Sequence, residues 1–413
     1  MRLQFIQATP MPKELKSCDE RIMIWIIALC SLMIAYADFL CIKRFGDRHS
    51  RRFRAVVSTI WAIDLMPLIF ALVCFLFTAD NPTWLGIVSG WIYFIYMVVV
   101  ISHAPLSFAI ALFSRRWIHV LGGGVMVVAI SIFFYSMLKT RTDYEVRSVV
   151  IESSKLPAQF DGYRIVQISD LHIGTMLNAE QEISQIAEKC NSLKPDMVVF
   201  TGDLVNIRYS EINEQIFKSL QKFQYKDGLY SVLGNHDIGT YIKDSISLTP
   251  EVNTERLIDL QERLGWKLLN NKTDYIKRGV DSIAITGLSF PKAMYETQHS
   301  SEIPDIGLDK IYSKLPHQCF NITMSHIPKM WDKILEVYPA DLTLSGHIHA
   351  MQMAMRVGKW RLSPSMILYK RWSGLYSEAG RYLYINDGIG YAMYPMRIGA
   401  RPEITLIELK CSK

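Results

Sequence analysis

Four long apolar stretches occupy the first third of the chain, and they constrain its fold more than any other feature. A helix needs about 20 mostly apolar residues to cross a lipid bilayer. Each stretch reaches that length, at residues 21–42, 55–79, 84–113 and 117–138. We therefore predict a four-helix transmembrane region over residues 1–140, followed by a domain over residues 141–413 that has the composition of a soluble protein.

Two of these stretches need comment. The first is too long for the apolar core of a signal peptide and is not followed by a small-residue cleavage site, so we expect it to stay in the mature protein. The third contains His103 and Pro105, which predict a kinked or strongly tilted helix. Asp38, Asp64 and His103 lie in or near the apolar stretches, where ionisable groups are costly. They are expected either to join helices by hydrogen bonds or to serve a function.

The basic residues between the stretches predict the orientation of the region. Six Lys and Arg lie in loop 43–54, two in loop 114–116 and none in loop 80–83. Short cytoplasmic loops are enriched in Lys and Arg, so the first and third loops are expected to face the cytoplasm. The N-terminus and residues 141–413 would then lie outside the cytoplasm, in a multi-pass protein of the plasma or inner membrane.

The charge balance argues against nucleic acid as a partner. Of the 45 Lys and Arg and 39 Asp and Glu, residues 1–140 hold 13 and 7, which leaves 32 of each downstream. A neutral soluble domain lacks the basic surface that nucleic-acid binding requires. The seven cysteines are scattered through the chain, so they predict structural thiols rather than disulfides or a catalytic nucleophile.

From residue 163 onward, short apolar strands alternate with amphipathic helices. Strands are predicted near 164–169, 196–202, 228–234, 266–270, 274–278, 282–287, 320–325 and 340–346, and in the segments "RYLYIND" and "EITLIEL". Helices are predicted at 179–193, 211–223, 250–264, 306–313 and 329–337, with Asn178 and Gln181 as a capping box and Pro250 at a first helical position. This alternation indicates a layered α/β domain.

Polar side chains follow five of these strands where each strand ends. In such folds, ligands gather at the carboxyl ends of strands. The five segments are Asp170-Leu171-His172, Gly202-Asp203, Gly234-Asn235-His236-Asp237, Ser325-His326 and Gly346-His347-Ile348-His349. Carboxylate, imidazole and amide-oxygen ligands suit Mn, Fe, Zn or Co, so we predict a site for divalent or trivalent metal ions. Two such ions about 3.5–4 Å apart are an established arrangement for displacement at phosphorus.

The ordered segments D-x-H, G-D, G-N-H-D, S-H and G-H-x-H resemble those of the calcineurin-like metallophosphoesterase family. The apolar N-terminal region is similar to that of its multi-pass, membrane-anchored bacterial members. The resemblance covers roughly residues 163–390 and implies a layered α/β/β/α domain with two metal ions, in which Mn, Fe or Zn are expected. It also implies a phosphate-containing substrate.

The resemblance further implies a role for each matching residue. Asp170, His172, Asp203 and His349 would hold one metal. The other would be held by Asp203, Asn235, His326 and His347, with Asp203 bridging the two. His236 would be a hydrogen-bond donor or general acid near the leaving oxygen, oriented by Asp237. Hydrolysis by a metal-bridging hydroxide is the implied reaction.

The last segment departs from the family pattern G-H-T-H-G-G-Q. Ile348, Ala350 and Met351 stand where many relatives have Thr and two Gly, so substrate contacts, and not metal binding, are expected to differ, with Ile348 and Ala350 as the expected sites of substrate preference. The segment "YKRWSGLY" (369–376) could contact phosphate, lie at the membrane interface or form an ordinary solvated loop. "NDGIG" (386–390) predicts a glycine turn, to which no chemistry is assigned.

Together these features predict a membrane-anchored, dinuclear-metal phosphoesterase that hydrolyses a phosphate ester or pyrophosphate. A position close to the lipid bilayer favours a lipid-linked or envelope-derived substrate. A non-catalytic metal-binding sensor or scaffold is an alternative, although the His236-Asp237 pair argues against it. A nucleotide-sugar pyrophosphatase that faces the cytoplasm is another alternative, and it would require the inverted topology.

Overall fold

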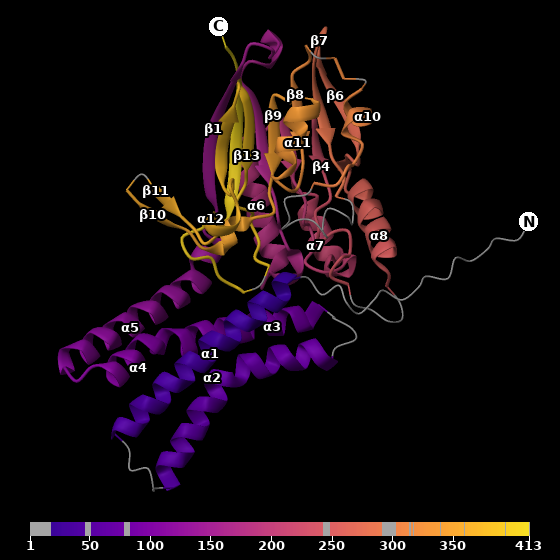
Figure 1. Ribbon diagram of the computed structural model, residues 1–413. Coiled ribbons are helices and arrows are strands. Elements are labelled where there is room, and N and C mark those ends of the chain that lie inside the picture. The colour runs from indigo at the N-terminus through magenta and orange to yellow at the C-terminus, as the bar shows by residue number, and fades with distance from the viewer. Residues whose placement is uncertain are drawn as a thin grey trace, which may run out of the picture. The chain divides into compact units, whose positions relative to one another are not determined.

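The protein is described by a computed structural model (Figure 1). It describes residues 18–45, 51–77, 83–242, 248–290 and 303–412, apart from positions 314, 317, 339, 359 and 393. Most of the N-terminal tail and parts of the basic loop 43–54 and of loop 80–83 therefore lie outside the described residues. Contacts divide the chain into two compact units, Met1–Thr78 with Val99–Val128, and Ala79–Val98 with Ala129–Lys413.

The apolar stretches form helices, as predicted. These are α1 (Cys18–Phe45), α2 (Arg51–Phe77), α3 (Thr83–Ile95), α4 (Ser102–Leu112) and α5 (Arg116–Leu138). The third stretch is interrupted by a π-helical turn at Tyr96–Ile101. Pro105 lies in the first turn of α4 and has no N–H to bond to the preceding turn, which accounts for the change of helical register just before it.

One helix in the described part of the chain is long and apolar enough to cross a membrane. It is Arg116–Thr142, with a mean hydropathy of 2.1, and Val98–Leu112 is a shorter apolar helix. The predicted arrangement of four spans therefore stays a prediction. In the first unit, Arg44 donates from Nη1 to the carbonyl oxygens of Ile110 and Phe113, each at 2.7 Å, and so caps the C-terminal end of α4.

The part of the chain that follows α5 contains two six-stranded sheets. The first has the order β1-β14-β2-β3-β4-β5 and the second β12-β13-β9-β8-β7-β6. The strands of the first are β1 (Glu145–Ser153), β14 (Glu403–Cys411), β2 (Tyr163–Ile168), β3 (Met197–Phe200), β4 (Gly228–Ser231) and β5 (Lys267–Leu268). Those of the second are β12 (Gly374–Glu378), β13 (Arg381–Ile385), β9 (Leu342–Ser345), β8 (Asn321–Met324), β7 (Asp281–Gly287) and β6 (Lys272–Arg278).

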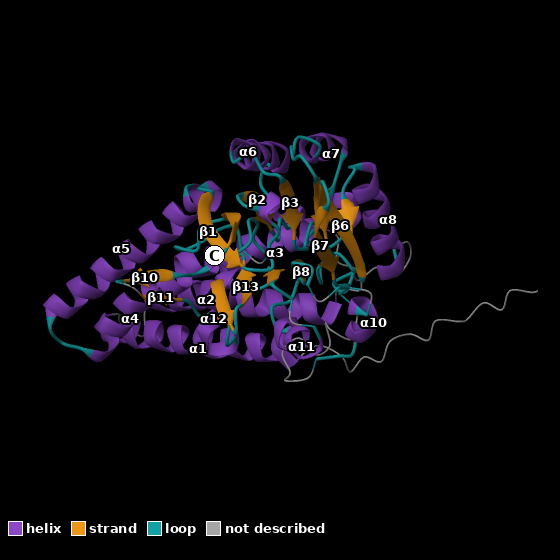
Figure 2. Ribbon diagram, turned by 90° about the horizontal axis from the view of Figure 1, so that it is seen from above, coloured by secondary structure: helices purple, strands orange, loops and turns teal. Residues whose placement is uncertain are grey.

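Helices cover the outer face of each sheet. Figure 2 shows α6 (Ala179–Ser192), α7 (Glu214–Leu220) and α8 (Pro250–Arg263) on one side, and α10 (Leu308–Tyr312) and α11 (Met330–Val337) on the other. Buried side chains from both sheets, such as Val199 and Ile322, form one core between them. Two further cores lie under the helices. The layered α/β architecture predicted from the alternation is confirmed, because each sheet buries one face on the other and one on helices.

Local sequence explains where the helices begin. The Asn178 side chain accepts a hydrogen bond from the N–H of Gln181 (3.3 Å), and Thr249 accepts one from Val252 (3.3 Å). Both caps satisfy a backbone donor that the first helical turn leaves free. Elements that the sequence did not predict are β1, β12, the hairpin of β10 (Met355–Val357) and β11 (Trp360–Leu362), and α12 (Ser365–Leu368).

Candidate metal centre

Five strands bring their carboxyl ends to one place. β2, β3 and β4 run parallel in the first sheet, and β8 and β9 run parallel in the second. The loops that follow them are joined by backbone hydrogen bonds, for example from the N–H of Asp170 to the carbonyl of Gly202 (2.9 Å). The metal-ligand side chains predicted there meet in what we call the strand-end cluster, which consists of Asp170, His172, Asp203, Asn235, His326, His347 and His349.

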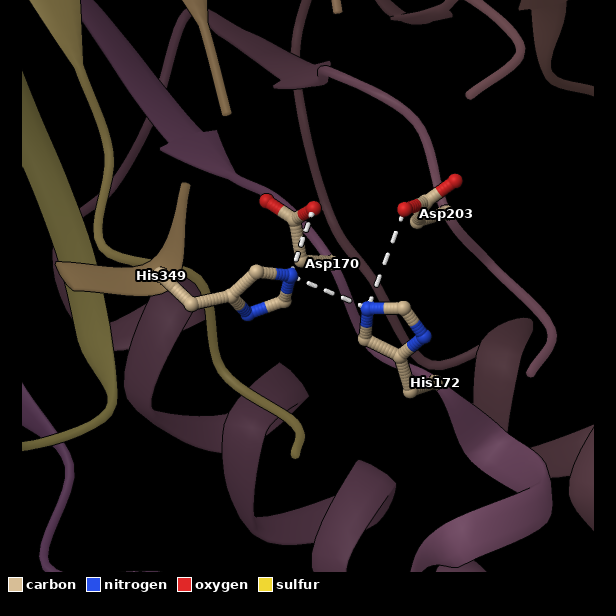
Figure 3. Close-up of side chains that lie close together, drawn as sticks. All are labelled: Asp170, His172, Asp203 and His349. Carbon is tan, nitrogen blue, oxygen red and sulfur yellow. Dashed lines mark hydrogen bonds and ion pairs between the residues drawn. The ribbon is translucent and has the colours of Figure 1, made fainter. Parts of the chain in front are cut away.

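One half of the cluster consists of Asp170, His172, Asp203 and His349 (Figure 3). Nε2 of His349 lies 3.1 Å from Nε2 of His172 and 3.2 Å from Oδ1 of Asp170. Nε2 of His172 lies 3.7 Å from Oδ2 of Asp203. These four side chains are buried, so their nitrogen and oxygen atoms face a small space that little water reaches.

The other half consists of Asp203, Asn235, His326 and His347. Oδ2 of Asp203 lies 3.2 Å from Nε2 of His326. Oδ1 of Asn235 lies between two rings, 3.0 Å from Nε2 of His326 and 2.9 Å from Nδ1 of His347. Asp203 belongs to both halves, as the bridging role predicted for it requires.

The backbone at the strand ends is held in an uncommon conformation. Asp170, His172, Asp203, His347 and His349 have φ angles of 54°, 44°, 59°, 75° and 54°. Such left-handed conformations are costly for residues with a Cβ and persist where the surrounding structure enforces them.

Glycines in the motifs leave room for the ligands. A Cβ at Gly234 would lie 2.1 Å from Oδ1 of Asp203, and one at Gly346 would lie 2.3 Å from Oδ2 of Asp170. The glycines that precede Asn235 and His347 are therefore required by the close approach of the carboxylates.

The carboxylates of the cluster are held in their ionised form. Burial by itself would raise the pKa of Asp170, but the neighbouring His349 outweighs it and holds that pKa well below its usual range. For Asp203, burial is likewise outweighed by His326 and His236, so its pKa is also far below the usual range. In return, Asp203 raises the pKa of His326 to about 9 against the effect of burial.

Two rings of the cluster are held neutral, as metal ligands must be. Burial lowers the pKa of His172 well below its usual value, and the neighbouring His236 adds to the effect. Burial, together with His326, lowers the pKa of His347 to about 3. Nδ1 of His326 lies 2.7 Å from the carbonyl oxygen of Thr201, which fixes a proton on Nδ1 and directs Nε2 toward Asp203. This donor set fits two metal ions with oxygen and nitrogen ligands.

The expected pairing of His236 with Asp237 is wrong. The Asp237 carboxylate accepts hydrogen bonds from the backbone N–H groups of Asp203 (2.8 Å), Leu204 (2.9 Å), Val205 (3.2 Å) and Gly234 (2.9 Å). Asp237 therefore shapes the loop that carries Asp203. Burial, with the charge of Asp203, raises the pKa of Asp237 to about 7.

His236 is oriented by other groups. Its Nδ1 donates to the carbonyl oxygen of Asn206 (2.5 Å), and its ring stacks on that of Tyr241 at a centroid distance of 4.3 Å. Tyr241 also accepts a hydrogen bond from Nδ2 of Asn235 (3.1 Å). Neither residue carries a sequence signal, because a backbone carbonyl has none and Tyr241 lies outside the motifs.

The glycine turn at 386–390 supports the cluster directly. A Cβ at Gly388 would lie 2.9 Å from Nδ1 of His349, and one at Gly390 would lie 2.0 Å from the carbonyl oxygen of Leu171. The turn is held by the fully buried Arg397, which donates to the carbonyl oxygens of Asp387 (3.0 Å) and Gly390 (2.9 Å). The sequence predicted this turn but not its role as a wall of the cluster.

Two of the three departures from the family pattern, Ala350 and Met351, lie in strained backbone. They have φ angles of 48° and 46°, and Gln352 after them has 55°, in a region that favours glycine. Ile348 has an ordinary φ of −84°. The side chains of Ile348 and Ala350 are buried, whereas Met351 is 40% exposed. Ile348 and Ala350 as sites of substrate preference stay a prediction, and Met351 is the one of these three residues that solvent reaches.

Segment 369–376 is held by contacts within the domain. Arg371 forms ion pairs with Asp332 (2.8 Å) and Glu378 (3.5 Å) and lies over the ring of Trp331. Trp372 is partly buried against Ala350 and Ala354. These contacts favour the structural interpretation of the segment for Arg371 and Trp372.

A largely buried set of two carboxylates, four imidazoles and one amide oxygen, placed at the strand ends of a two-sheet α/β domain, defines a metal-dependent hydrolase of the phosphoesterase class. The sequence model of the calcineurin-like phosphoesterases matches residues 163–351, a range that contains every member of the strand-end cluster. Residues 163–351 thus form a domain of the calcineurin-like metallophosphoesterase family, and the chain is a metal-dependent phosphoesterase.

Several relatives share this domain. The uncharacterized metallophosphoesterase YkuE of Bacillus subtilis is 28% identical over 63% of this chain and 83% of its own length. A transmembrane protein with metallophosphoesterase domain from Danio rerio is 27% identical over 69% of this chain, which spans 62% of that relative. The UDP-2,3-diacylglucosamine pyrophosphatase LpxG of Chlamydia trachomatis is 27% identical over 61% of this chain and 84% of its own length.

Proposed function

We propose that the protein is a membrane-anchored, dinuclear-metal phosphoesterase that hydrolyses a phosphate ester or pyrophosphate of a lipid-linked or envelope-derived compound. The observation that carries the dinuclear assignment is the shared position of Asp203, whose carboxylate lies 3.7 Å from His172 and 3.2 Å from His326. Asp170, His172, Asp203 and His349 would hold one metal, and Asp203, Asn235, His326 and His347 the other.

Two cations bound there would supply a water molecule activated near neutral pH and would neutralise the phosphoryl oxygens. The residues around them have separate tasks. His236 keeps Nε2 available for the leaving oxygen because its Nδ1 is committed to the carbonyl of Asn206. A negatively charged phosphoryl group next to this ring favours its protonated form, so His236 can donate a proton as the bond to phosphorus breaks. Asp237 acts indirectly, because its carboxylate fixes the backbone of the loop that carries Asp203.

An exposed apolar segment beside the cluster supports an acylated substrate. β10, β11 and α12 form this segment, residues 355–368, in which Trp360 is 66% exposed and Ile367 86% exposed. Ser363 donates to the carbonyl oxygen of Ala350 (2.8 Å), the residue after His349, and so ties the segment to the cluster. Apolar side chains in such a position can contact acyl chains or the surface of a bilayer.

Membrane attachment is supported by helix Arg116–Thr142 and by the transmembrane relatives. In the proposed topology, the four apolar stretches cross the membrane and residues 141–413 face away from the cytoplasm. Reporter fusions after Ser50 and at the C-terminus would test it, with the first expected in the cytoplasm and the second outside. Reporters on the same side would contradict this topology.

A second candidate is a cytoplasm-facing pyrophosphatase of an acylated nucleotide sugar. The Chlamydia relative is named for such a substrate, UDP-2,3-diacylglucosamine. The exposed apolar segment suits it equally well, so the two candidates differ in the side of the membrane on which the catalytic domain lies. The topology test separates them.

The catalytic test uses the full-length protein in detergent, stripped of metal and then supplied with Mn²⁺ or Zn²⁺. Hydrolysis of a phosphomonoester, a phosphodiester and a pyrophosphate is measured for the wild type, Asn235→Ala and His236→Ala. We expect His236→Ala to keep its metals and lose about 10²–10⁴-fold in rate, as for a missing general acid. Asn235→Ala is expected to lose metal as well as rate.

The matched control for Asn235→Ala is Asn213→Ala, which removes the N-cap of α7 by the same change (Oδ1 to the N–H of Ile216, 2.9 Å). It should cost about 1 kcal/mol of stability and leave the metals in place. Full metal content and activity in Asn235→Ala would contradict its assignment as a ligand. For the substrate, Ile367→Ser should raise KM for an acylated phosphate only, whereas Val280→Ser, at another exposed position, should not.

A further inference from the structure

Three ionisable side chains meet within the helices of the first unit. Asp38 of α1, Asp64 of α2 and His103 of α4 are far apart in sequence, yet one ligand atom from each lies within 4.8 Å of the others. Nε2 of His103 lies 2.7 Å from Oδ2 of Asp38 and 3.9 Å from Oδ1 of Asp64. We call these three residues the helix cluster. Its members belong to neither the strand-end cluster nor its supporting loops.

Asp64 has the most unfavourable environment of the three residues. It is fully buried, and among the described residues no side-chain or backbone donor makes a hydrogen bond to its carboxylate oxygens; Nε2 of His103, at 3.9 Å, and the Asp38 carboxyl group are its polar neighbours. A buried carboxylate without a partner is strongly unfavourable in an apolar helix bundle. Asp38 is 4% exposed and faces the same space, so two buried carboxylates approach each other.

The ring of His103 has the orientation of a metal ligand. Its Nδ1 lies 2.5 Å from the carbonyl oxygen of Val99, and because a carbonyl only accepts, this nitrogen carries a proton. Nε2 then points at Asp38 and Asp64. Metal-bound histidines commonly donate their other ring N–H to a backbone carbonyl in this way. A neutral ring would place its Nε2 lone pair against a carboxylate oxygen, which is repulsive unless a metal ion or a proton lies between them.

The charges of the three side chains indicate that a cation is missing from the helix cluster. Even with His103 protonated, one carboxylate of the pair would remain uncompensated unless it took up a proton, because the cluster contains two acids and one base. A divalent cation bound to two carboxylates and a neutral imidazole balances the charge and also partners both oxygens of the orphaned group. We propose that Asp38, Asp64 and His103 bind a divalent transition-metal ion, such as Zn²⁺, Mn²⁺ or Co²⁺, that links α1, α2 and α4. An imidazole ligand favours these ions over Mg²⁺ and Ca²⁺, which prefer oxygen.

The test counts metal in the full-length protein in detergent. The background variant Asp203→Asn/His347→Ala/His349→Ala removes ligands from both halves of the strand-end cluster. After equilibration with Co²⁺ and removal of free ion, we expect about one bound Co²⁺ per chain, with the visible absorption of coordinated cobalt and a higher Tm than the chelated protein. Adding Asp64→Asn to this background should abolish the bound Co²⁺, the absorption and the Tm shift.

The matched control is Trp61→Phe in the same background. It removes an α1–α2 hydrogen bond, from Nε1 of Trp61 to the carbonyl oxygen of Ala35 (3.1 Å), without touching the helix cluster. It should lower Tm and still bind Co²⁺. Size-exclusion elution and helical circular dichroism verify that each variant is folded. Absence of bound Co²⁺ in the background variant, or the same Co²⁺ content with and without Asp64, would overturn the proposal.

Discussion

The strand-end cluster and the helix cluster use the same kinds of side chain but are constructed differently. The strand-end cluster takes its residues from loops whose backbone is fixed by Asp237, by glycines at close approaches and by left-handed φ angles. The helix cluster takes its residues from regular helices, and among the described residues of α1, α2 and α4 none has a positive φ. One site is built by bending the backbone and the other by packing helices together.

This difference indicates how substitutions should affect metal binding in each cluster. A change in the backbone of a strand-end loop should misplace several ligands at once, because the loops are bonded to one another. In the helix cluster, each ligand depends on its own side chain and on the packing of its helix. We therefore expect a substitution in a strand-end loop to weaken metal binding through several ligands at once. A substitution in the helix cluster should affect only the ligand that it removes.

The largest effect is expected from Gly346→Ala. The new Cβ would lie 2.0 Å from Oγ of Ser169 and 2.3 Å from Oδ2 of Asp170, so the loop that carries His347 and His349 must shift. We expect metal affinity to fall at least ~10–100-fold, as for loss of an outer partner of a metal ligand, with hydrolysis falling in parallel. Gly124→Ala is the control, because a Cβ there meets nothing within 4 Å. Unchanged metal affinity in Gly346→Ala would show that the loops are more adaptable than we infer.

Asp237→Asn should have the next largest effect. An amide nitrogen cannot accept the hydrogen bonds that a carboxylate oxygen does, so buried N–H groups near Asp203 lose their acceptor. Each such group costs about 1–3 kcal/mol of unfolding free energy, measurable by urea denaturation of the metal-free protein. Asp305→Asn, at an exposed carboxylate that accepts from the N–H of Gly307 (2.8 Å), should change it little. Equal stability losses in both variants would show that the Asp237 carboxylate stabilises the fold no more than an exposed carboxylate does.

The third prediction concerns the pH dependence of the metal-free protein. Asp203 raises the pKa of His326 to about 9, above the usual 6.5 of an unfolded chain. A raised histidine pKa stabilises the fold fully below pH 6.5, and this contribution is lost as pH rises through about 9. Tm should therefore fall over that interval, and His326→Gln should reduce the slope. The same slope in both proteins would show that His326 is not the group responsible.

The smallest effect is expected from Met351→Gly. Met351 has a φ of 46° and an exposed side chain, so glycine relieves backbone strain without opening a cavity. The relief of roughly 1–2 kcal/mol is partly offset by the greater chain entropy of glycine, about 0.5–1 kcal/mol, so a gain of up to about 1 kcal/mol is expected. Met355→Gly, in extended strand β10, should instead destabilise the protein. A loss of stability in both variants would indicate that strain at Met351 is negligible.

The two clusters also differ in how far the sequence predicts them. Asp170, Asp203 and His326 each follow an apolar strand, and because parallel strands end at one edge, their meeting could be expected. Asp38, Asp64 and His103 were noticed only as costly residues, since no periodicity relates positions on three separate helices. The partner of His236 was missed for a similar reason, because the accepting group is the backbone carbonyl of Asn206. Strand β1 was not predicted because most of its side chains are only partly buried, so it lacks the continuous apolar run of the central strands.

The position of β14 has a consequence for biosynthesis. This strand is formed by residues 403–411, yet it lies between β1 and β2 and pairs with both. The first sheet therefore cannot close until the ribosome has completed nearly the whole chain, long after the apolar helices have left it. Long-range pairing of this kind is slow and leaves strand edges exposed. The first sheet of the nascent domain therefore stays incomplete until its last strand has been synthesised.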